Sequence, residues 1–165
     1  MNITRETSLF FDASVLVAGA HSPQGGSALL LAACARGGFR AQMSPAVLLE
    51  TLHALEEFPQ KSRTTFERLL REIDWDFLPV PSEEVLTRYE RYIDTKDVHV
   101  LAAAVEEEAD FLLTLDRRHI LAAVDKVREG GLDINILRPG DFIREYYPQH
   151  ENYTHLPRPR DEGEA

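Results

Sequence analysis

Cysteine is almost absent from this chain, which holds one, Cys34, in 165 residues. A single cysteine cannot form an intramolecular disulfide, so the sequence fits a reducing compartment. Cys34 lies among leucines and alanines, which is typical of a small core residue. The chain also has no cysteine cluster, which is a usual sequence sign of a zinc site.

Long apolar runs are missing as well. No run approaches the roughly 20 residues that a membrane-spanning helix needs. The first residues lack the basic start and apolar core of a secretory signal peptide. With 44% hydrophobic and 28% charged residues, the composition is that of a globular protein. We therefore expect a cytoplasmic protein with no membrane attachment and a sizeable core.

Positive charge is scarce, because 18 Lys and Arg stand against 28 Asp and Glu, a formal net charge of −10. This balance argues against non-specific binding of nucleic acid through a general positive field. A nucleic-acid substrate is still compatible, because a site that gathers carboxylates needs metal cations, and these reverse the local charge. Part of the acidic excess, Asp161, Glu162 and Glu164, also lies in the terminal tail.

Short apolar runs alternate with amphipathic helical patterns along the chain. Strands are predicted near residues 8–12, 39–42, 74–80, 111–115 and 134–137. This alternation predicts an α/β fold with a central parallel sheet and helices on both faces, a three-layer α/β/α sandwich. We expect residues 1–147 to form one domain, and residues 148–165, which are polar and contain prolines, to form a flexible tail.

Two of the predicted strands end in an aspartate, Asp12 and Asp116. If these strands are neighbours in a parallel sheet, both carboxylates emerge at its carboxyl edge, where open α/β sheets bind ligands. Asp97 starts the helix that leads into the second of these strands. Glu50 interrupts an apolar stretch of another helix, so it either borders the buried face or is held against a cation.

Taken alone, Asp12 also fits a simple turn residue, and Ser14 is predicted to cap a helix that begins at Val15. Four converging carboxylates would repel one another and raise each other's pKa values. Hard divalent cations such as Mg²⁺ relieve this repulsion and prefer oxygen ligands. The acidic set therefore matches metal-assisted hydrolysis of a phosphodiester.

Four sequence blocks together resemble the motifs of the PIN-domain family. They follow the family's order and spacing over residues 8–147 and comprise residues 9–16, 44–50, 97–104 and 109–116. The first contains an apolar-apolar-Asp-x-Ser-apolar pattern, the second a Ser before a helix with an acidic residue, and the fourth a Thr-x-Asp ending. The resemblance implies a PIN-like α/β/α sandwich with Mg²⁺- or Mn²⁺-dependent ribonuclease activity.

The resemblance also implies roles for individual residues. It assigns catalysis and metal binding to Asp12, Glu50, Asp97 and Asp116, and it makes Ser14 and Thr114 supporting hydroxyls that orient the site. Many members are VapC-type toxins of toxin–antitoxin pairs, which commonly dimerise and are blocked by a small antitoxin. RNA, an antitoxin protein and a second copy of the chain are therefore the expected partners.

One departure from the family pattern follows the fourth block. Many members carry a further acidic residue there, whereas this chain continues with Arg117, Arg118 and His119. A second metal ion is then expected to bind weakly or only together with substrate. Arg117 and Arg118 either contact RNA phosphates or are exposed charges at a helix start, and the sequence leaves both interpretations open.

Two other functions compete with the nuclease. A PIN-like binding module with a degenerate, inactive site is favoured by the missing acidic residue and the acidic surface. A receiver- or flavodoxin-like protein would share the strand-end aspartates. A phospho-acceptor domain, however, needs a Lys at the end of its last strand, where this chain has Leu137, Arg138 and Pro139.

Overall fold

The structure, a computed structural model, describes residues 1–159. Its centre is a parallel sheet of five strands in the order β3-β2-β1-β4-β5. The strands are β1 Ser8–Phe11, β2 Arg40–Met43, β3 Asp76–Phe77, β4 Phe111–Leu113 and β5 Asn135–Leu137. The predicted α/β fold with a central parallel sheet is thus confirmed, and the two strands that lead to Asp12 and Asp116 are direct neighbours.

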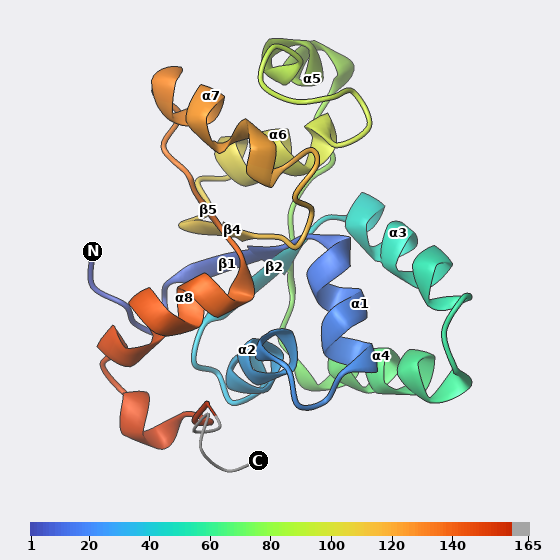
Figure 1. The fold of residues 1–165 in the computed structure, drawn as a ribbon, viewed down its shortest axis with the longest axis vertical. Coiled ribbons are helices and arrows are strands. Elements are labelled where there is room, and N and C mark those ends of the chain that lie inside the picture. Colours follow the sequence, from blue (N-terminus) through green and yellow to red (C-terminus); the bar gives the residue numbers. More distant parts are fainter. Residues whose placement is uncertain (160–165) are drawn as a thin grey trace.

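Helices cover both faces of the sheet (Figure 1). They are α1 Ala13–His21, α2 Gly26–Ala35, α3 Pro45–Leu55, α4 Gln60–Glu72, α5 Glu83–Tyr89, α6 Val98–Glu106, α7 Val124–Glu129 and α8 Pro139–Glu145. Short 3₁₀ turns are η1 Leu121–Ala123, η2 Tyr147–Gln149 and η3 Tyr153–His155. Helices α5, α6 and α7 lie on one face, and α1, α2 and α8 on the other, which gives the three layers (Figure 1). No helix within residues 1–159 has the length and apolar character needed to cross a membrane.

Local sequence signals explain where several elements begin and end. The Ser44 side chain accepts a hydrogen bond from the backbone N–H of Val47 at 3.2 Å, and Pro45 occupies the first turn, so α3 starts where its sequence predicts.

The strand expected over 74–80 is shorter in the structure. Only β3 is paired as a strand, because the prolines that follow, Pro79 and Pro81, cannot donate to a strand ladder.

The core lies between the sheet and the two helical layers. All residues of β1 and β4 are buried, as expected for strands covered on both faces. Aromatic side chains join the layers, since Phe111 of β4 meets Phe142 of α8 edge to face at 4.9 Å between ring centroids. The central strands are therefore fixed by packing on both sides, and the loops at their ends start from rigid positions.

The C-terminal segment differs from the expected tail. Residues 148–156 fold back against the domain instead of leaving it at Tyr147. His150 is buried, pairs with Ile3 in a β-bridge and donates from Nε2 to the carbonyl oxygen of Gly38 at 2.7 Å. Leu156 is buried too, and the Tyr147 hydroxyl donates to the carbonyl oxygen of Pro157. The expectation of a flexible tail was wrong because this segment is polar in sequence yet buries His150 and Leu156, which are spaced apart along it. The rest of the predicted tail, residues 160–165, lies outside the described residues.

Candidate active site

The candidate site lies where the order of the strands changes direction. From β1 the chain places β2 and β3 on one side, and β4 and β5 on the other. In open α/β sheets the crevice at such a switch point, outside the carboxyl ends of the strands, is the usual ligand site. Asp12 follows β1 and Thr114 follows β4, so both residues lie at this switch point.

Asp12 is buried and held by two hydroxyl groups. Its Oδ2 accepts hydrogen bonds from Ser14 Oγ at 2.7 Å and from Thr114 Oγ1 at 2.9 Å. Ser14 Oγ in turn accepts from the backbone N–H of Leu115 at 3.0 Å. The prediction that Ser14 caps a helix from Val15 is wrong, because α1 begins at Ala13 with Asp12 as the N-cap. The Ser14 hydroxyl instead links the ends of β1 and β4.

Asp116 is oriented by the backbone of its own turn. Its Oδ1 accepts from the N–H groups of Arg118 at 3.1 Å and His119 at 3.0 Å. Its own N–H donates to Thr114 Oγ1 at 3.0 Å. The Thr114 hydroxyl therefore contacts both Asp12 and Asp116, and it fixes the two strand-end carboxylates relative to one another.

Asp97 occupies the N-cap position of α6 and makes no side-chain capping bond there. Only 9% of the residue is exposed, and its buried Oδ2 has no hydrogen-bond partner. His119 Nδ1 lies 3.4 Å from this atom and 3.3 Å from Asp116 Oδ2. One ligand atom from each of Asp97, Asp116 and His119 lies within 4.8 Å of the others.

The electrostatics of Asp97 reflect this crowding. Burial raises the pKa of its carboxyl group, and the negative charges of Asp116 and Asp12 raise it further. His119 and Lys96 act in the opposite direction and lower the same pKa. An added cation would favour the charged form of Asp97. The carboxylates of Asp12, Asp97 and Asp116 are therefore placed to bind a positive ligand.

Glu50 lies beside this group and not within it. It is an exposed residue of α3, and its Oε1 lies 2.8 Å from His99 Nε2 in the first turn of α6. Of the three buried side-chain atoms without a hydrogen-bond partner in residues 1–159, two belong to the start of α6: Asp97 Oδ2 and His99 Nδ1. The structure thus brings Asp12, Asp97 and Asp116 together and connects Glu50 to their surroundings through His99.

His119 is the site residue that sequence reasoning missed. Its position three residues after Asp116, where many members carry a further acidic residue, was the available signal. Its two neighbours, Arg117 and Arg118, are exposed, and within the described chain neither side chain forms an ion pair. Both arginines therefore remain available to an anionic ligand.

The residues of the site fit a divalent cation. Carboxylate oxygens suit hard cations, and one imidazole nitrogen is also acceptable to Mn²⁺ and other transition metals. Asp97 Oδ2, which has no hydrogen-bond partner, is the observation that tests this fit, because a buried carboxylate oxygen without a hydrogen-bond donor is costly unless a cation lies beside it. The carboxylate and imidazole ligand atoms and the Asp97 oxygen without a hydrogen bond are therefore both consistent with a bound divalent cation.

Comparisons with solved structures show the same fold in proteins of low sequence identity. PAE2754 from Pyrobaculum aerophilum is 17% identical, with a TM-score of 0.50, over 70% of this chain and 83% of that one. VapBC2 from Rickettsia felis, bound to a DNA fragment from the promoter, is 12% identical, with a TM-score of 0.52. That match covers 79% of this chain and 98% of the other.

No curated protein sequence matches this chain significantly. The family model that matches is the PIN domain, over residues 8–118. This range contains β1, β4 and every carboxylate described above, so the match covers the candidate site as well as most of the fold. The chain therefore belongs to the PIN domain family.

Proposed function

We propose that the protein is a metal-dependent endoribonuclease that hydrolyses RNA phosphodiester bonds. The observation that carries this proposal is the convergence of Asp12, Asp97 and Asp116 at the switch point, where the buried Asp97 Oδ2 has no hydrogen-bond partner and only the His119 imidazole lies near it, at 3.4 Å. Structural roles alone do not account for this arrangement, because like charges that crowd without a cation destabilise the fold. The family match supports a nuclease, since the PIN-domain resemblance implies that chemistry.

The residues divide into ligands and supports. Asp97, Asp116 and His119, whose ligand atoms lie within 4.8 Å of one another, would hold the Mg²⁺ or Mn²⁺ ion, and Asp12, joined to the Asp116 turn through Thr114, would complete the set. Glu50 lies beside them, paired with His99. When bound, the ion supplies the Lewis acidity that phosphodiester hydrolysis requires. Ser14 and Thr114 fix the Asp12 carboxylate by hydrogen bonding, which keeps the site preorganised.

The wider proposal is that this nuclease is the toxin of a toxin–antitoxin pair and acts in the cytoplasm. The structural similarity to VapBC2 supports it. The expected partners are a small antitoxin that covers the acidic crevice and a second copy of the chain. Co-expression with the neighbouring open reading frame, followed by size-exclusion chromatography with light scattering, measures both associations.

The function itself is tested by incubating the purified protein with structured and single-stranded RNAs. Reactions contain Mg²⁺, Mn²⁺ or EDTA, and wild type is compared with Asp12→Asn. We expect cleavage that requires both the metal and Asp12. Cleavage that persists in EDTA or in the Asp12→Asn variant would contradict the proposal.

A PIN-like binding module with an inactive site is the alternative. Two observations favour it: Glu50 pairs with His99, and no acidic residue follows Asp116 in its turn. Isothermal titration with Mn²⁺ separates the two functions. A module predicts no binding that depends on Asp12, whereas the nuclease predicts binding that Asp12→Asn removes.

A further inference from the structure

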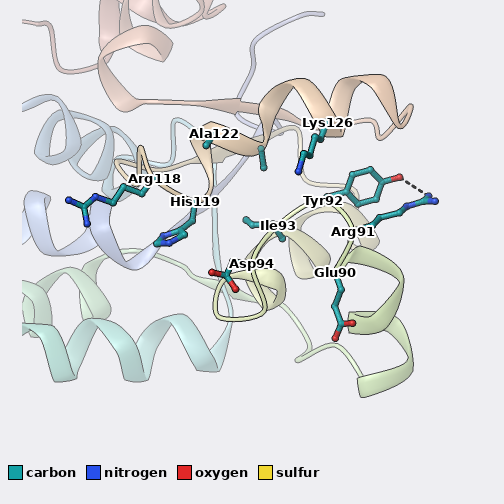
Figure 2. Close-up of a pocket in the computed structure, with 10 residues that line it drawn as sticks. Glu90, Arg91, Tyr92, Ile93, Asp94, Arg118, His119, Ala122 and Lys126 are labelled. Carbon is teal, nitrogen blue, oxygen red and sulfur yellow. Dashed lines mark hydrogen bonds between the residues drawn. The ribbon is translucent and has the colours of Figure 1, made fainter.

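A hollow adjoins the acidic group at His119. It has a volume of about 340 Å³ and lies between the segment after α5 and the segment from η1 to α7 (Figure 2). Its lining includes Tyr92, Ile93, Asp94, His119, Ala122 and Lys126. This volume is at the lower end of the range for small-ligand pockets, about 300–1,000 Å³, and suits one nucleotide better than a folded partner.

His119 connects this hollow to the acidic group. The same imidazole that lies 3.4 Å from Asp97 Oδ2 and 3.3 Å from Asp116 Oδ2 forms part of the wall. Figure 2 shows His119 between Arg118 and Asp94, on the far side of the hollow from Tyr92. A ligand in the hollow is therefore a direct neighbour of a ligand bound by the carboxylates.

The hollow is lined by charges of both signs, Arg91, Arg118 and Lys126 against Glu90 and Asp94. Most arginines elsewhere are neutralised, for example Arg63 by Glu67 and Arg68 by Glu72 on α4. Arg118 and Lys126, in contrast, form no ion pair with any residue of the described chain. Figure 2 shows Lys126 extending from α7 toward the loop that carries Ile93. Unpaired cations next to a carboxylate cluster suit a ligand that is itself anionic, such as a phosphate.

The remaining walls suit a base. Ile93 and Ala123 are buried and give an apolar surface, while Ala122 is exposed at the rim. Asp94 adds carboxylate oxygens, which accept hydrogen bonds from the amino groups of bases. Base-paired RNA cannot place a base in such a hollow, whereas the unstacked bases of a single strand are free to enter.

We propose that this hollow is a nucleotide-binding subsite that holds the nucleotide next to the scissile phosphodiester, with Lys126 binding its phosphate. The inference rests on the proposed ribonuclease function and adds the position of a flanking nucleotide and the residues that hold it. Phosphate contacts supply affinity, and the shape of the hollow excludes duplex.

The first test measures binding of a short, fluorescently labelled oligouridylate by anisotropy in EDTA, so that no cleavage interferes. Lys126→Gln should weaken binding about tenfold and lower the slope of log affinity against log salt by about one. Lys61→Gln is the matched control, because Lys61 is also exposed and without a carboxylate partner, but it lies on α4. Affinities that are equal in the two variants would overturn the subsite.

A second variant tests the hollow itself without changing any charge. Ala122→Trp fills the space from an exposed position, so the fold should tolerate it. We expect weaker binding of the oligouridylate and unchanged Mn²⁺ affinity. A labelled polyglutamate peptide is the control ligand, and equal binding of this peptide and RNA would overturn the assignment to a nucleotide.

Failure of this inference is distinguishable from failure of the proposed function. If cleavage requires metal and Asp12 while Lys126→Gln and Ala122→Trp bind and cleave RNA like wild type, the ribonuclease stands and the subsite is refuted. If no RNA is cleaved although binding depends on Lys126, the subsite stands and the ribonuclease is refuted.

Discussion

The two ends of β4 each have an aspartate nearby, and the two are surrounded very differently. At the amino end, Asp110 Oδ2 accepts from the N–H of Ser8 at 2.8 Å and from its Oγ at 3.2 Å, and Ser8 Oγ accepts from the Asp110 N–H at 2.8 Å. At the carboxyl end, Asp116 shares a crevice with Asp12 and Asp97. A carboxylate that has its own donors holds the fold, whereas carboxylates that crowd one another need a ligand.

The largest difference is expected when one substitution is made at both ends of β4. Asp116→Asn should lower Mn²⁺ affinity and RNA cleavage by more than about 100-fold, because even residues that only orient ligands contribute about 10–100-fold. Asp110→Asn should leave both unchanged and lower the melting temperature instead. Isothermal titration measures the Mn²⁺ affinity of both variants, and thermal unfolding measures their stability. Similar Mn²⁺ affinities in the two variants would contradict the assignment of metal binding to Asp116 and a structural role to Asp110.

Thr114→Val tests the hydroxyl that joins Asp12 to the Asp116 turn. The valine keeps the shape but removes the donor to Asp12 Oδ2 and the acceptor for the Asp116 N–H. Metal affinity should fall about 10–100-fold, the usual effect of losing a group that orients a ligand. Thr87→Val, on the exposed surface of α5, is a control with no expected effect on metal affinity. Wild-type affinity in Thr114→Val would show that Asp12 needs no such support.

Ser8→Ala tests the structural role of Asp110 at the amino end of β4. The change removes a hydroxyl that both donates to and accepts from Asp110, in a residue only 3% exposed. Leaving a buried donor without a partner costs about 1–3 kcal/mol in the free energy of unfolding. Urea unfolding followed by circular dichroism measures the loss. Mn²⁺ affinity serves as the internal control and should not change.

The smallest expected effect is that of Asp97→Asn on the stability of the metal-free protein, and it should be stabilising. Because the pKa of Asp97 is raised in the folded state, its charged form opposes folding at neutral pH. In EDTA the variant should therefore melt a few degrees higher at pH 7, each 1 kcal/mol corresponding to about 2–4 °C. The difference should disappear as the pH falls below the ordinary Asp value, where both states are protonated.

Metal provides the control for this prediction. Saturating Mn²⁺ should raise the melting temperature of the wild type and have a smaller effect on Asp97→Asn, since the variant loses one ligand. A lower melting temperature for the variant in EDTA at pH 7 would show that Asp97 is satisfied in the fold by contacts other than a cation.

The parallel sheet and the meeting of Asp12 with Asp116 could be predicted from sequence because both follow from local patterns. Apolar runs predict strands, and parallel neighbours place their carboxyl ends at one edge. His119 could not be found this way, since its role depends on a turn that brings its ring to Asp97. The pairing of Glu50 with His99 joins α3 to α6, and no local pattern predicts a contact across 49 residues.

Two of the errors in the fold have the same origin. Ser14 looked like a helix cap because Ser is a common cap, yet its hydroxyl bonds across to Leu115, 101 residues away. The segment after Tyr147 looked like a tail because its sequence is polar, but His150 and Leu156 are buried by distant residues. Non-local contacts decided both of these cases, whereas the strand expected over 74–80 was cut short by prolines in the sequence itself.

The return of the C-terminal segment to Ile3 and Gly38 has a consequence for how the chain comes apart. Ile3 precedes β1 and Gly38 precedes β2, so His150 joins the N-terminal segment to the chain entering the sheet at its amino edge. Fraying from either end must break the same contacts, which makes the two ends of the described chain one cooperative unit. The amino edge of the sheet is thereby closed by contacts between the two terminal segments.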